Sequence, residues 1–311
     1  MVDPETYRRV LDGVATVEVV EMSAVADLVA AGADADAVVL DVGLPFPAAA
    51  AEELSHLRAV ARSSVGVAGI DVEAAADAGI AVLHAPEYCR DEVATHTLAL
   101  FLACVRAVPE YDRAVRAGDW PRTPPSRALH RLAGDTVGLV AYGRIARSVR
   151  ERLRGFGVDV VAHDPYVSAA AMADDGVERV DRAELFARAD HVSVHAPDTT
   201  ETRGLVGADA LAALPERGVL VNTGRGHVVD ESALADALRG GEIACAGLDV
   251  FEEEPLPEDS PLRGRDDVVF TPHAAWYSEE SRDEVNETVA TDLRRVLTGA
   301  DPKYAADDEW L

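Results

Sequence analysis

Lysine is almost absent from this sequence. Of its 311 residues 29 are Lys or Arg and 56 are Asp or Glu, which gives a formal charge of −27, and Lys303 is the one lysine. A chain this acidic, without a basic patch, repels phosphate backbones and anionic lipids, so we expect neither nucleic acid nor a membrane as a partner. Abundant acids with almost no lysine also resemble proteins of salt-rich cytoplasms, so we expect a halophilic protein.

Cysteine is scarce as well. Cys89, Cys104 and Cys245 are odd in number and far apart in the chain, which fits neither a disulfide framework nor a zinc site. No stretch approaches the roughly 20 apolar residues of a membrane span, and the first five residues do not begin like a secretory signal. We therefore expect a cytoplasmic protein with ordinary thiols and no metal.

What the sequence does contain is an alternation of short β-rich runs with alanine-rich segments of helical character. Such alternation predicts βαβ units and parallel sheets, hence an α/β fold, and the length of 311 residues suggests two domains. In the first part of the chain we predict strands at 17–20, 37–40, 57–61 and 81–83. In the second part we predict strands at 136–141, 158–163, 191–194, 218–222, 244–248 and 268–270.

Two long helices are also predicted. The first runs from about 91 to 117 and ends near Gly118, ahead of the proline-rich linker candidate at 121–126. The second runs from about 278 to 297, because Ser278 is a good capping residue and two acidic residues follow it in the first turn.

A nucleotide-binding turn is suggested by the run from Ala141 to Ala146, which follows the strand at 136–141 and continues as a helix. Of the Gly-x-Gly-x-x-Gly fingerprint only the middle glycine, Gly143, is kept, the one that lets the backbone approach a pyrophosphate. Alanine is accepted at the third position, but Ala141 at the first position crowds the tight turn. A plain strand-to-helix connection therefore stays open as the alternative.

Asp164 strengthens the nucleotide interpretation. It follows the next predicted strand, about 20 residues after Gly143, where a carboxylate accepts hydrogen bonds from ribose hydroxyls. Such a carboxylate repels a 2′-phosphate, so NAD is preferred over NADP. The alternative is a turn residue before Pro165.

Three further segments each follow a predicted strand: 222–226, 247–255 and 271–276. Because the carboxyl ends of parallel strands share one edge of a sheet, we expect Arg225, Glu254 and His273 to meet there. Taken singly, each also has a structural interpretation: a solvated loop cation, one acid of an acidic run, and a residue at a helix start.

With these motifs the chain resembles the D-isomer-specific 2-hydroxyacid dehydrogenases over essentially its whole length. The run 273–279, together with 164–166, is most similar to the C-terminal-binding-protein branch, named for transcriptional corepressors that retain the dehydrogenase fold. The resemblance implies two doubly wound parallel-sheet domains and a homodimer. A Rossmann-like nucleotide domain, residues 93–280, is inserted in a flavodoxin-like substrate domain made of residues 1–92 and 281–311.

The resemblance also implies an activity, the NAD-dependent reduction of a 2-oxo acid to a D-2-hydroxy acid. His273 is the implied proton donor, because imidazole titrates near working pH, and Glu254 is its partner. Arg225 is implied to grip the substrate carboxylate, which suits a planar guanidinium that stays charged.

The implied cofactor residues include Asp249, whose carboxylate would accept from the nicotinamide carboxamide; its alternative is a capping role. The whole cofactor set is Tyr142, Gly143, Arg144, Ile145, Asp164, His195, Ala196, Pro197, Thr202, Thr223, Gly224, Asp249 and Ala275.

The implied substrate residues are Arg62, Val65, Gly66 and Trp276. Amides at Val65 and Gly66 would bind the substrate carboxylate, and Arg62 is either near the substrate or a surface ion-pair partner. The chain departs from its relatives at 68–69, where Ala-Gly replaces a usual Asp-Asn pair. Trp276 would form an apolar wall, suited to a substrate with a medium apolar or thioether side chain, with core packing as its alternative. Phosphorylated substrates fit poorly, because they would want more cations than Arg62 and Arg225.

Two other functions stay open. One is a non-catalytic, NAD-sensing binding protein like the corepressors, favoured by the altered glycine turn and by the change at 68–69. The other is a glyoxylate or hydroxypyruvate reductase, which differs only in substrate size.

Overall fold

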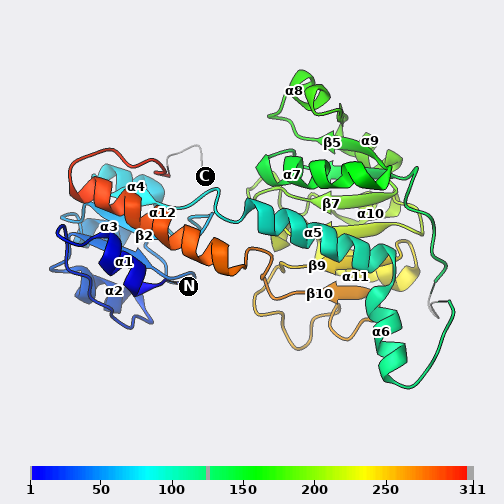
Figure 1. Ribbon diagram of the computed structural model, residues 1–311, viewed down its shortest axis with the longest axis horizontal. Coiled ribbons are helices and arrows are strands. Elements are labelled where there is room, and N and C mark those ends of the chain that lie inside the picture. Colours follow the sequence, from blue (N-terminus) through cyan, green and yellow to red (C-terminus); the bar gives the residue numbers. More distant parts are fainter. Residues whose placement is uncertain (1, 124–126, 307–311) are drawn as a thin grey trace. The chain divides into compact units, whose positions relative to one another are not determined.

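The computed structural model describes residues 2–123 and 127–306. These residues form two compact units (Figure 1). Unit 1 contains the described residues up to 89 and from 277 onward, and unit 2 contains residues 90–276. The boundaries expected from the sequence, 92 and 280, lie a few residues further along the chain.

Unit 1 is built on a parallel sheet of three strands in the order β1-β2-β3. Its strands are β1 (Ala37–Leu40), β2 (Ala59–Arg62) and β3 (Ala81–Leu83). Its helices are α1 (Pro4–Val10), α2 (Val25–Gly32), α3 (Ala48–Glu53), α4 (Val72–Asp77) and α12 (Glu279–Leu297). The predicted last helix is confirmed with its cap, since the side chain of Ser278 accepts a hydrogen bond from the amide of Ser281.

The predicted strand at 17–20 is wrong. These residues pair with no strand, and Val19 and Val20 are 62% and 50% exposed. Glu18 and Glu21 flank them, and a parallel strand is normally covered on both faces, where acidic side chains are costly. A β-branched run therefore does not make a strand when its neighbours cannot be buried.

Unit 2 is built on a seven-stranded sheet in the order β10-β9-β8-β7-β4-β5-β6, and all its strand pairs are parallel. The α/β class with parallel sheets is thereby confirmed. The six predicted strands are present, and a short exposed strand, β6, was missed. The strands are β4 (Thr136–Val140), β5 (Asp159–His163), β6 (Glu178–Arg179), β7 (His191–Val194), β8 (Val219–Asn222), β9 (Cys245–Leu248) and β10 (Val268–Phe270).

Helices cover both faces of this sheet. One face packs a hydrophobic cluster with α5 (Arg90–Val105), α7 (Arg144–Leu153) and α8 (Ala169–Asp174). The other face packs a cluster with α9 (Arg182–Arg188), α10 (Ala208–Ala212) and α11 (Glu231–Gly240). Short 3-10 turns lie at η1 (Arg154–Phe156) and η2 (Gly226–Val228). The strand order reverses between β4 and β7, and ligands of such sheets bind beyond the strand carboxyl ends at that reversal.

The helix predicted over 91–117 is two helices, α5 and α6 (Val108–Arg116), with a 63° bend between them. Pro109 explains the break, because a proline clashes with the carbonyl four residues earlier and cannot continue a helix. Ala107 turns the chain with a left-handed φ of 52°. Among the described residues no single helix is long and apolar enough to cross a membrane; only α5 and α6 together pass that test, by length and composition. The last three residues of the linker candidate at 121–126 lie outside the described residues.

Candidate active site

His273 and Glu254 form a hydrogen-bonded pair in the loops that follow β10 and β9. Nδ1 of His273 lies 2.7 Å from Oε2 of Glu254, while Oε1 of Glu254 accepts from the amide of Phe251 at 3.0 Å. Burial opposes ionisation of Glu254, but these bonds and the positive charges of His273 and Arg225 hold the pKa of its carboxyl below the ordinary value. The His273 side chain is 47% exposed, so its Nε2 is the ring nitrogen left to meet a ligand.

The backbone of His273 is held in an unusual conformation. Its φ of 53° lies in the left-handed region, which costs a non-glycine residue on the order of 1–3 kcal/mol and persists only when the surroundings determine it. The amide of His273 donates to the carbonyls of Asp249 at 2.7 Å and Thr271 at 3.1 Å. The loop that carries the imidazole is thus fixed by its neighbours.

Asp249 supplies most of that constraint. It is 1% exposed, and Oδ1 accepts from the hydroxyl of Thr271 at 2.6 Å and the amide of Ala274 at 2.9 Å, while Oδ2 accepts from the amide of Ala275 at 3.0 Å. His96 of α5 contacts the same hydroxyl through Nε2 at 2.9 Å. Asp249 and the Ala275 amide therefore hold the His273 loop together, while the carboxamide contact expected for Asp249 stays a prediction.

Arg225 is presented by a tight turn that Asn222 organises. The buried Asn222 side chain accepts from the amide of Gly224 at 3.0 Å and donates to the carbonyl of Arg225 at 2.9 Å. The Arg225 guanidinium donates to the carbonyl of Gly224 at 2.7 Å, and its charge acts on Glu254. Arg225, Glu254 and His273 are thus brought together in unit 2, as the strand-end argument expects.

Sequence reasoning gave no role to Asn222 or Gly226, although both lie in a segment that it singled out. A Cβ added at Gly226 would lie 1.9 Å from the backbone of Phe251, so only glycine lets the Arg225 turn pack against the Glu254 loop. Gly226 itself was a signal of a close backbone approach, but the sequence of one chain does not say which backbone segment it approaches.

The turn after β4 combines strain with open space. Ala141 has a φ of 69°, the conformation for which the fingerprint supplies glycine. A Cβ added at Gly143 would meet nothing within 4 Å, which fits the close approach of a pyrophosphate. The amide of Tyr142 donates to Oδ2 of Asp164 at 2.8 Å, so a phosphate bound at this turn would meet the amides of the first turn of α7, at Arg144 and Ile145.

Asp164 follows β5, is nearly buried, and accepts a hydrogen bond through each of its carboxylate oxygens. Besides Tyr142, it accepts from the amide of Tyr166, through Oδ1 at 2.8 Å. Asp164 therefore stabilises the turn, as the alternative interpretation expects. Because each carboxylate oxygen has more than one acceptor site, it could also accept from ribose hydroxyls.

The loop after β7 is braced locally. Thr202 donates through its hydroxyl to the carbonyl of Pro197 at 2.5 Å. His195 contacts the hydroxyl of Ser193 through Nε2 at 2.9 Å, and its buried Nδ1 has no partner within the described residues. Burial lowers the pKa of His195 to about 4, so this imidazole is neutral at working pH and not an acid catalyst.

Two contacts position Thr223 and Gly224, which the sequence predicts to bind the cofactor. A Cβ added at Gly224 would lie 3.1 Å from the carbonyl oxygen of buried Ala196, so the 195–202 and 222–226 loops pack backbone to backbone. Thr223 pairs its hydroxyl with that of Thr97 in α5 at 2.7 Å. These residues line one edge of the sheet at the carboxyl ends of β7 and β8.

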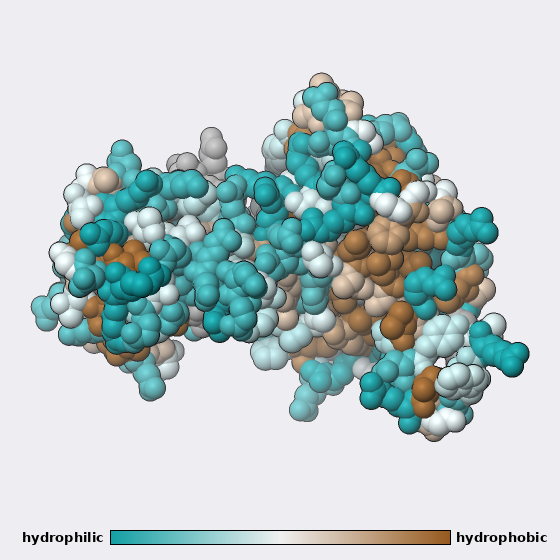
Figure 2. Space-filling view, in the orientation of Figure 1, coloured by the Kyte–Doolittle hydropathy of each residue, from teal (hydrophilic) through white to brown (hydrophobic). Residues whose placement is uncertain are grey.

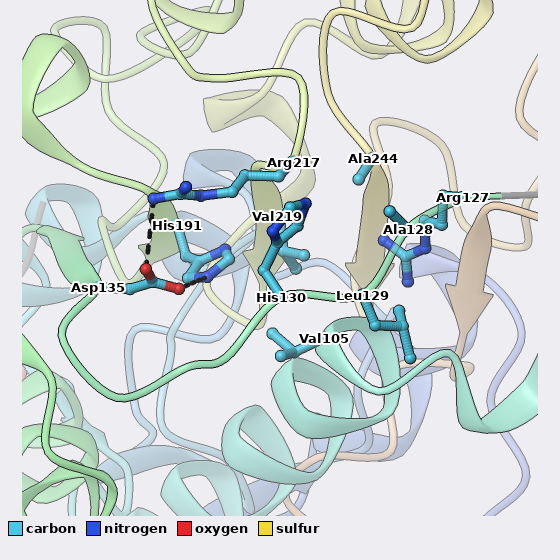
Figure 3. Close-up of a pocket in the computed structure, with 10 residues that line it drawn as sticks. All are labelled: Val105, Arg127, Ala128, Leu129, His130, Asp135, His191, Arg217, Val219 and Ala244. Carbon is cyan, nitrogen blue, oxygen red and sulfur yellow. Dashed lines mark hydrogen bonds and ion pairs between the residues drawn. The ribbon is translucent and has the colours of Figure 1, made fainter. Parts of the chain in front are cut away.

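Two hollows in unit 2 differ greatly in size. One of about 690 Å³ adjoins Glu254 and His273 and has apolar walls from Phe251, Leu256 and Phe270. The other, of about 20 Å³, lies at the opposite strand ends, where Asp135 joins His191 and Arg217 (Figure 3). The smaller hollow holds about one water, so it cannot take a substrate.

The residues expected to bind substrate divide between the units. Trp276 is half-buried in unit 2, three residues after His273. Arg62 ends β2 in unit 1, is 4% exposed and donates to the carbonyls of Leu44 and Ala68. Val65 and Gly66 follow it in a half-buried loop.

Comparison with known proteins supplies a family. Residues 98–275 match the family model described as "D-isomer specific 2-hydroxyacid dehydrogenase, NAD binding domain". The glyoxylate reductase of Korarchaeum cryptofilum is 39% identical over 278 residues, which cover 89% of this chain and 84% of that protein. A solved structure of a Thermus thermophilus protein has a TM-score of 0.89 and 33% identity, covering 99% of this chain and 98% of the other.

Some similar proteins are much longer than this chain. The D-3-phosphoglycerate dehydrogenase of Mycobacterium tuberculosis (strain ATCC 25618 / H37Rv) is 42% identical over 272 residues, 88% of this chain but 51% of that protein. The chain thus spans about half the length of these curated relatives.

Proposed function

Because this chain belongs to the D-isomer specific 2-hydroxyacid dehydrogenase family, we propose that it reduces a 2-oxo acid to a D-2-hydroxy acid with NADH. The observation that carries the proposal is the His273–Glu254 pair, whose atoms lie 2.7 Å apart with the charge of Arg225 close by. An acid, its orienting carboxylate and an anion-binding guanidinium are the groups that this reduction needs.

His273 supplies the proton. Glu254 fixes the ring through Nδ1, which leaves Nε2 to donate to the oxygen of the substrate carbonyl. Since the pKa of the Glu254 carboxyl is held below its ordinary value, the carboxylate is charged at neutral pH and stabilises the protonated imidazole. The pair is then ready to give its proton as negative charge develops on the oxygen.

Arg225 binds the substrate carboxylate and polarises the carbonyl beside it. A guanidinium suits both tasks, because its planar fork matches a carboxylate and keeps its charge. Asn222 keeps the turn that presents it in one conformation. When bound, NADH supplies the hydride for the carbonyl carbon.

The residues after β4 and β5 suit NAD. The open space at Gly143 admits a pyrophosphate, and the first turn of α7 offers its amides. Asp164 accepts from ribose hydroxyls and repels a 2′-phosphate. We therefore propose NADH over NADPH.

The substrate has an apolar side chain in this proposal. Phe251, Leu256 and Phe270 form apolar walls beside His273, and Trp276 adds an indole nearby in the chain. In unit 1 the amides of Val65 and Gly66 bind the carboxylate. An activity on phosphoglycerate belongs to relatives about twice as long as this chain and is not part of the proposal.

A panel of 2-oxo acids, followed by NADH and NADPH absorbance, tests this function. We expect turnover of a medium-sized apolar 2-oxo acid with NADH, and a D-configured product by chiral chromatography. Preference for glyoxylate or hydroxypyruvate identifies the second candidate, which the 39% identical Korarchaeum cryptofilum reductase favours. Binding of NADH without turnover of any 2-oxo acid contradicts the proposal and supports the corepressor-like role suggested by the strained turn at Ala141.

We also propose a homodimer formed through α5 and α6. Figure 2 shows hydrophobic residues gathered on unit 2 where α5 runs in Figure 1. Leu98 and Leu102 of α5 are only partly buried, and Val108 and Val115 of α6 are exposed, as on a helix that a second copy covers. The mass measured by light scattering should be twice the mass of the chain. Val115→Glu should lower the measured mass towards that of the monomer. A monomeric mass for the wild type contradicts the proposed homodimer.

The charge of −27 leads us to propose dependence on salt. Self-repulsion between exposed carboxylates destabilises the folded chain until ions screen it. We expect the melting temperature to rise with KCl up to molar concentrations, and an unchanged melting temperature contradicts this.

A further inference from the structure

The segment 63–69, which we call the substrate loop, has its carbonyls bound within unit 1. The carbonyl of Ser64 accepts from the amide of Ala85 at 2.9 Å, and that of Val65 accepts from Nδ1 of His84 at 2.7 Å. Further along, the hydroxyl of Ser64 donates to Gly66 at 2.6 Å, and the amides of Ile70 and Phe46 donate to Val67 and Gly69 at 2.9 and 2.8 Å.

Binding the carbonyls fixes where the amides point. In a trans peptide the C=O and the N–H point in opposite directions. Because the carbonyls of Ser64 and Val65 are turned to Ala85 and His84, the next amides, of Val65 and Gly66, are turned the other way. Neither amide has a partner within the described residues. Successive amides aimed outward form a concave anion-binding surface.

Arg62 closes the far end of this loop. Its guanidinium donates to the carbonyl of Ala68 and to that of Leu44, and so ties the loop to the segment that follows β1. Ala68 and Gly69 have no polar side chain of their own, and Gly69 has a left-handed φ of 80°. Among the described residues, Arg62 is the one side chain that hydrogen-bonds this end of the loop.

The surroundings of Arg62 do not suit an anion ligand. The side chain is 4% exposed, and Nε is buried without a partner in the described part of the chain. Burial lowers the pKa of the guanidinium, opposed by the charge of Asp41. A second substrate anion could reach this group only if the substrate loop opened and broke the bonds that shape it.

We propose that Arg62 is a positioning residue that braces the substrate loop, and that the site therefore takes 2-oxo acids with one carboxylate and an uncharged side chain. This inference rests on the proposed function and refines its substrate class. Two readouts test it, one structural and one kinetic. Arg58 offers a matched control, because it also donates to two carbonyls of unit 1, those of Val296 and Leu297, away from the loop.

The structural readout is hydrogen exchange by mass spectrometry on the wild type, Arg62→Gln and Arg58→Gln. We expect about tenfold faster exchange in peptides covering 63–71 for Arg62→Gln only, with unit 2 unchanged. Arg62→Lys serves if the glutamine variant does not fold, since a single ammonium cannot reproduce the two-carbonyl fork. Unchanged exchange at 63–71 overturns the bracing role.

The kinetic readout compares an apolar 2-oxo acid with one of similar length that carries a phosphate. We expect the wild type to prefer the apolar acid, and Arg62→Gln to raise KM about tenfold for both, with kcat less affected. A selective loss for the phosphorylated acid would make Arg62 an anion ligand and overturn the inference. No wild-type turnover at all would count against the proposed function, and the exchange result would then still decide the role of Arg62.

Discussion

The loops of unit 2 that present Arg225 and His273 are braced by one acid and one amide, whereas the substrate loop of unit 1 is braced by two bases. Asp249 and Asn222 accept from backbone amides of the first group, and Asn222 also donates to the carbonyl of Arg225. Arg62 and His84 hold the second through backbone carbonyls. Each kind of brace matches what its loop presents.

The difference has an electrostatic reason. A loop that carries cationic side chains gains from a nearby carboxylate, which stabilises their charge as well as their geometry. A loop that binds an anion through its amides would be weakened by a carboxylate at the same place. The Arg62 guanidinium and the His84 imidazole hold the carbonyls without placing a negative charge beside the amides. The chemistry of a brace therefore reflects the groups that its loop presents, which are cationic side chains in unit 2 and backbone amides in unit 1.

Replacing the His273 imidazole should have the largest effect on turnover. His273→Gln removes the proton donor but leaves the braces in place, so kcat should fall by on the order of 10² to 10⁴. NADH affinity, measured by fluorescence titration, should stay the same. His227→Gln, at an exposed histidine two residues from Arg225, is the control with wild-type turnover. Equal activity of the two variants would contradict the assignment of His273.

Weakening the brace should have a smaller effect. Asp249→Asn leaves a loop amide without an acceptor, at a cost of about 1–3 kcal/mol, so the melting temperature and kcat should both fall while NADH affinity is kept. If Asp249 bound the nicotinamide carboxamide, Asp249→Asn would also lower the affinity for NADH. Asp292→Asn is the control, because Asp292 accepts from the amides of Lys303 and Tyr304 in unit 1 and should lose stability without losing kcat.

The nucleotide turn should give the smallest effect. Ala141→Gly removes left-handed strain, offset by the entropy of a freer unfolded chain, so the free energy of unfolding should rise by about 0.5–1 kcal/mol. Ala107→Gly, at the α5–α6 break, relieves similar strain, because Ala107 has a φ of 52° and Ala141 has a φ of 69°. Thermal unfolding should show both gains, and NADH binding should tighten only for Ala141→Gly. No gain in either variant would show that the turn carries no strain.

The central strands of unit 2, β4 and β7 to β9, could be predicted because they are almost wholly buried and their runs are mostly apolar. The 17–20 run shows the limit of that signal, since its composition is that of a strand but its acidic neighbours stay in solvent. The break at Ala107 was missed because the apolar pattern continues through it, although Pro109 gave a signal.

The braces could not be predicted. The family resemblance predicted Asp249 and Arg62 as site residues, but a carboxylate or guanidinium near a site can meet a ligand or a backbone equally well. Which it does depends on burial and on a few ångströms of loop path, here 1% exposure for Asp249 and 4% for Arg62. Neither quantity follows from residue type or spacing.

The central claim is that Arg225, Glu254 and His273 act together on a 2-oxo acid. Its most direct test is the kcat/KM for NADH oxidation by Arg225→Ala, Glu254→Gln and His273→Gln, measured with NADH affinity on the same preparations. We expect each variant to lose at least about tenfold in kcat/KM while the Kd for NADH stays within about twofold. A variant that keeps wild-type kcat/KM with a substrate the wild type reduces would contradict the account.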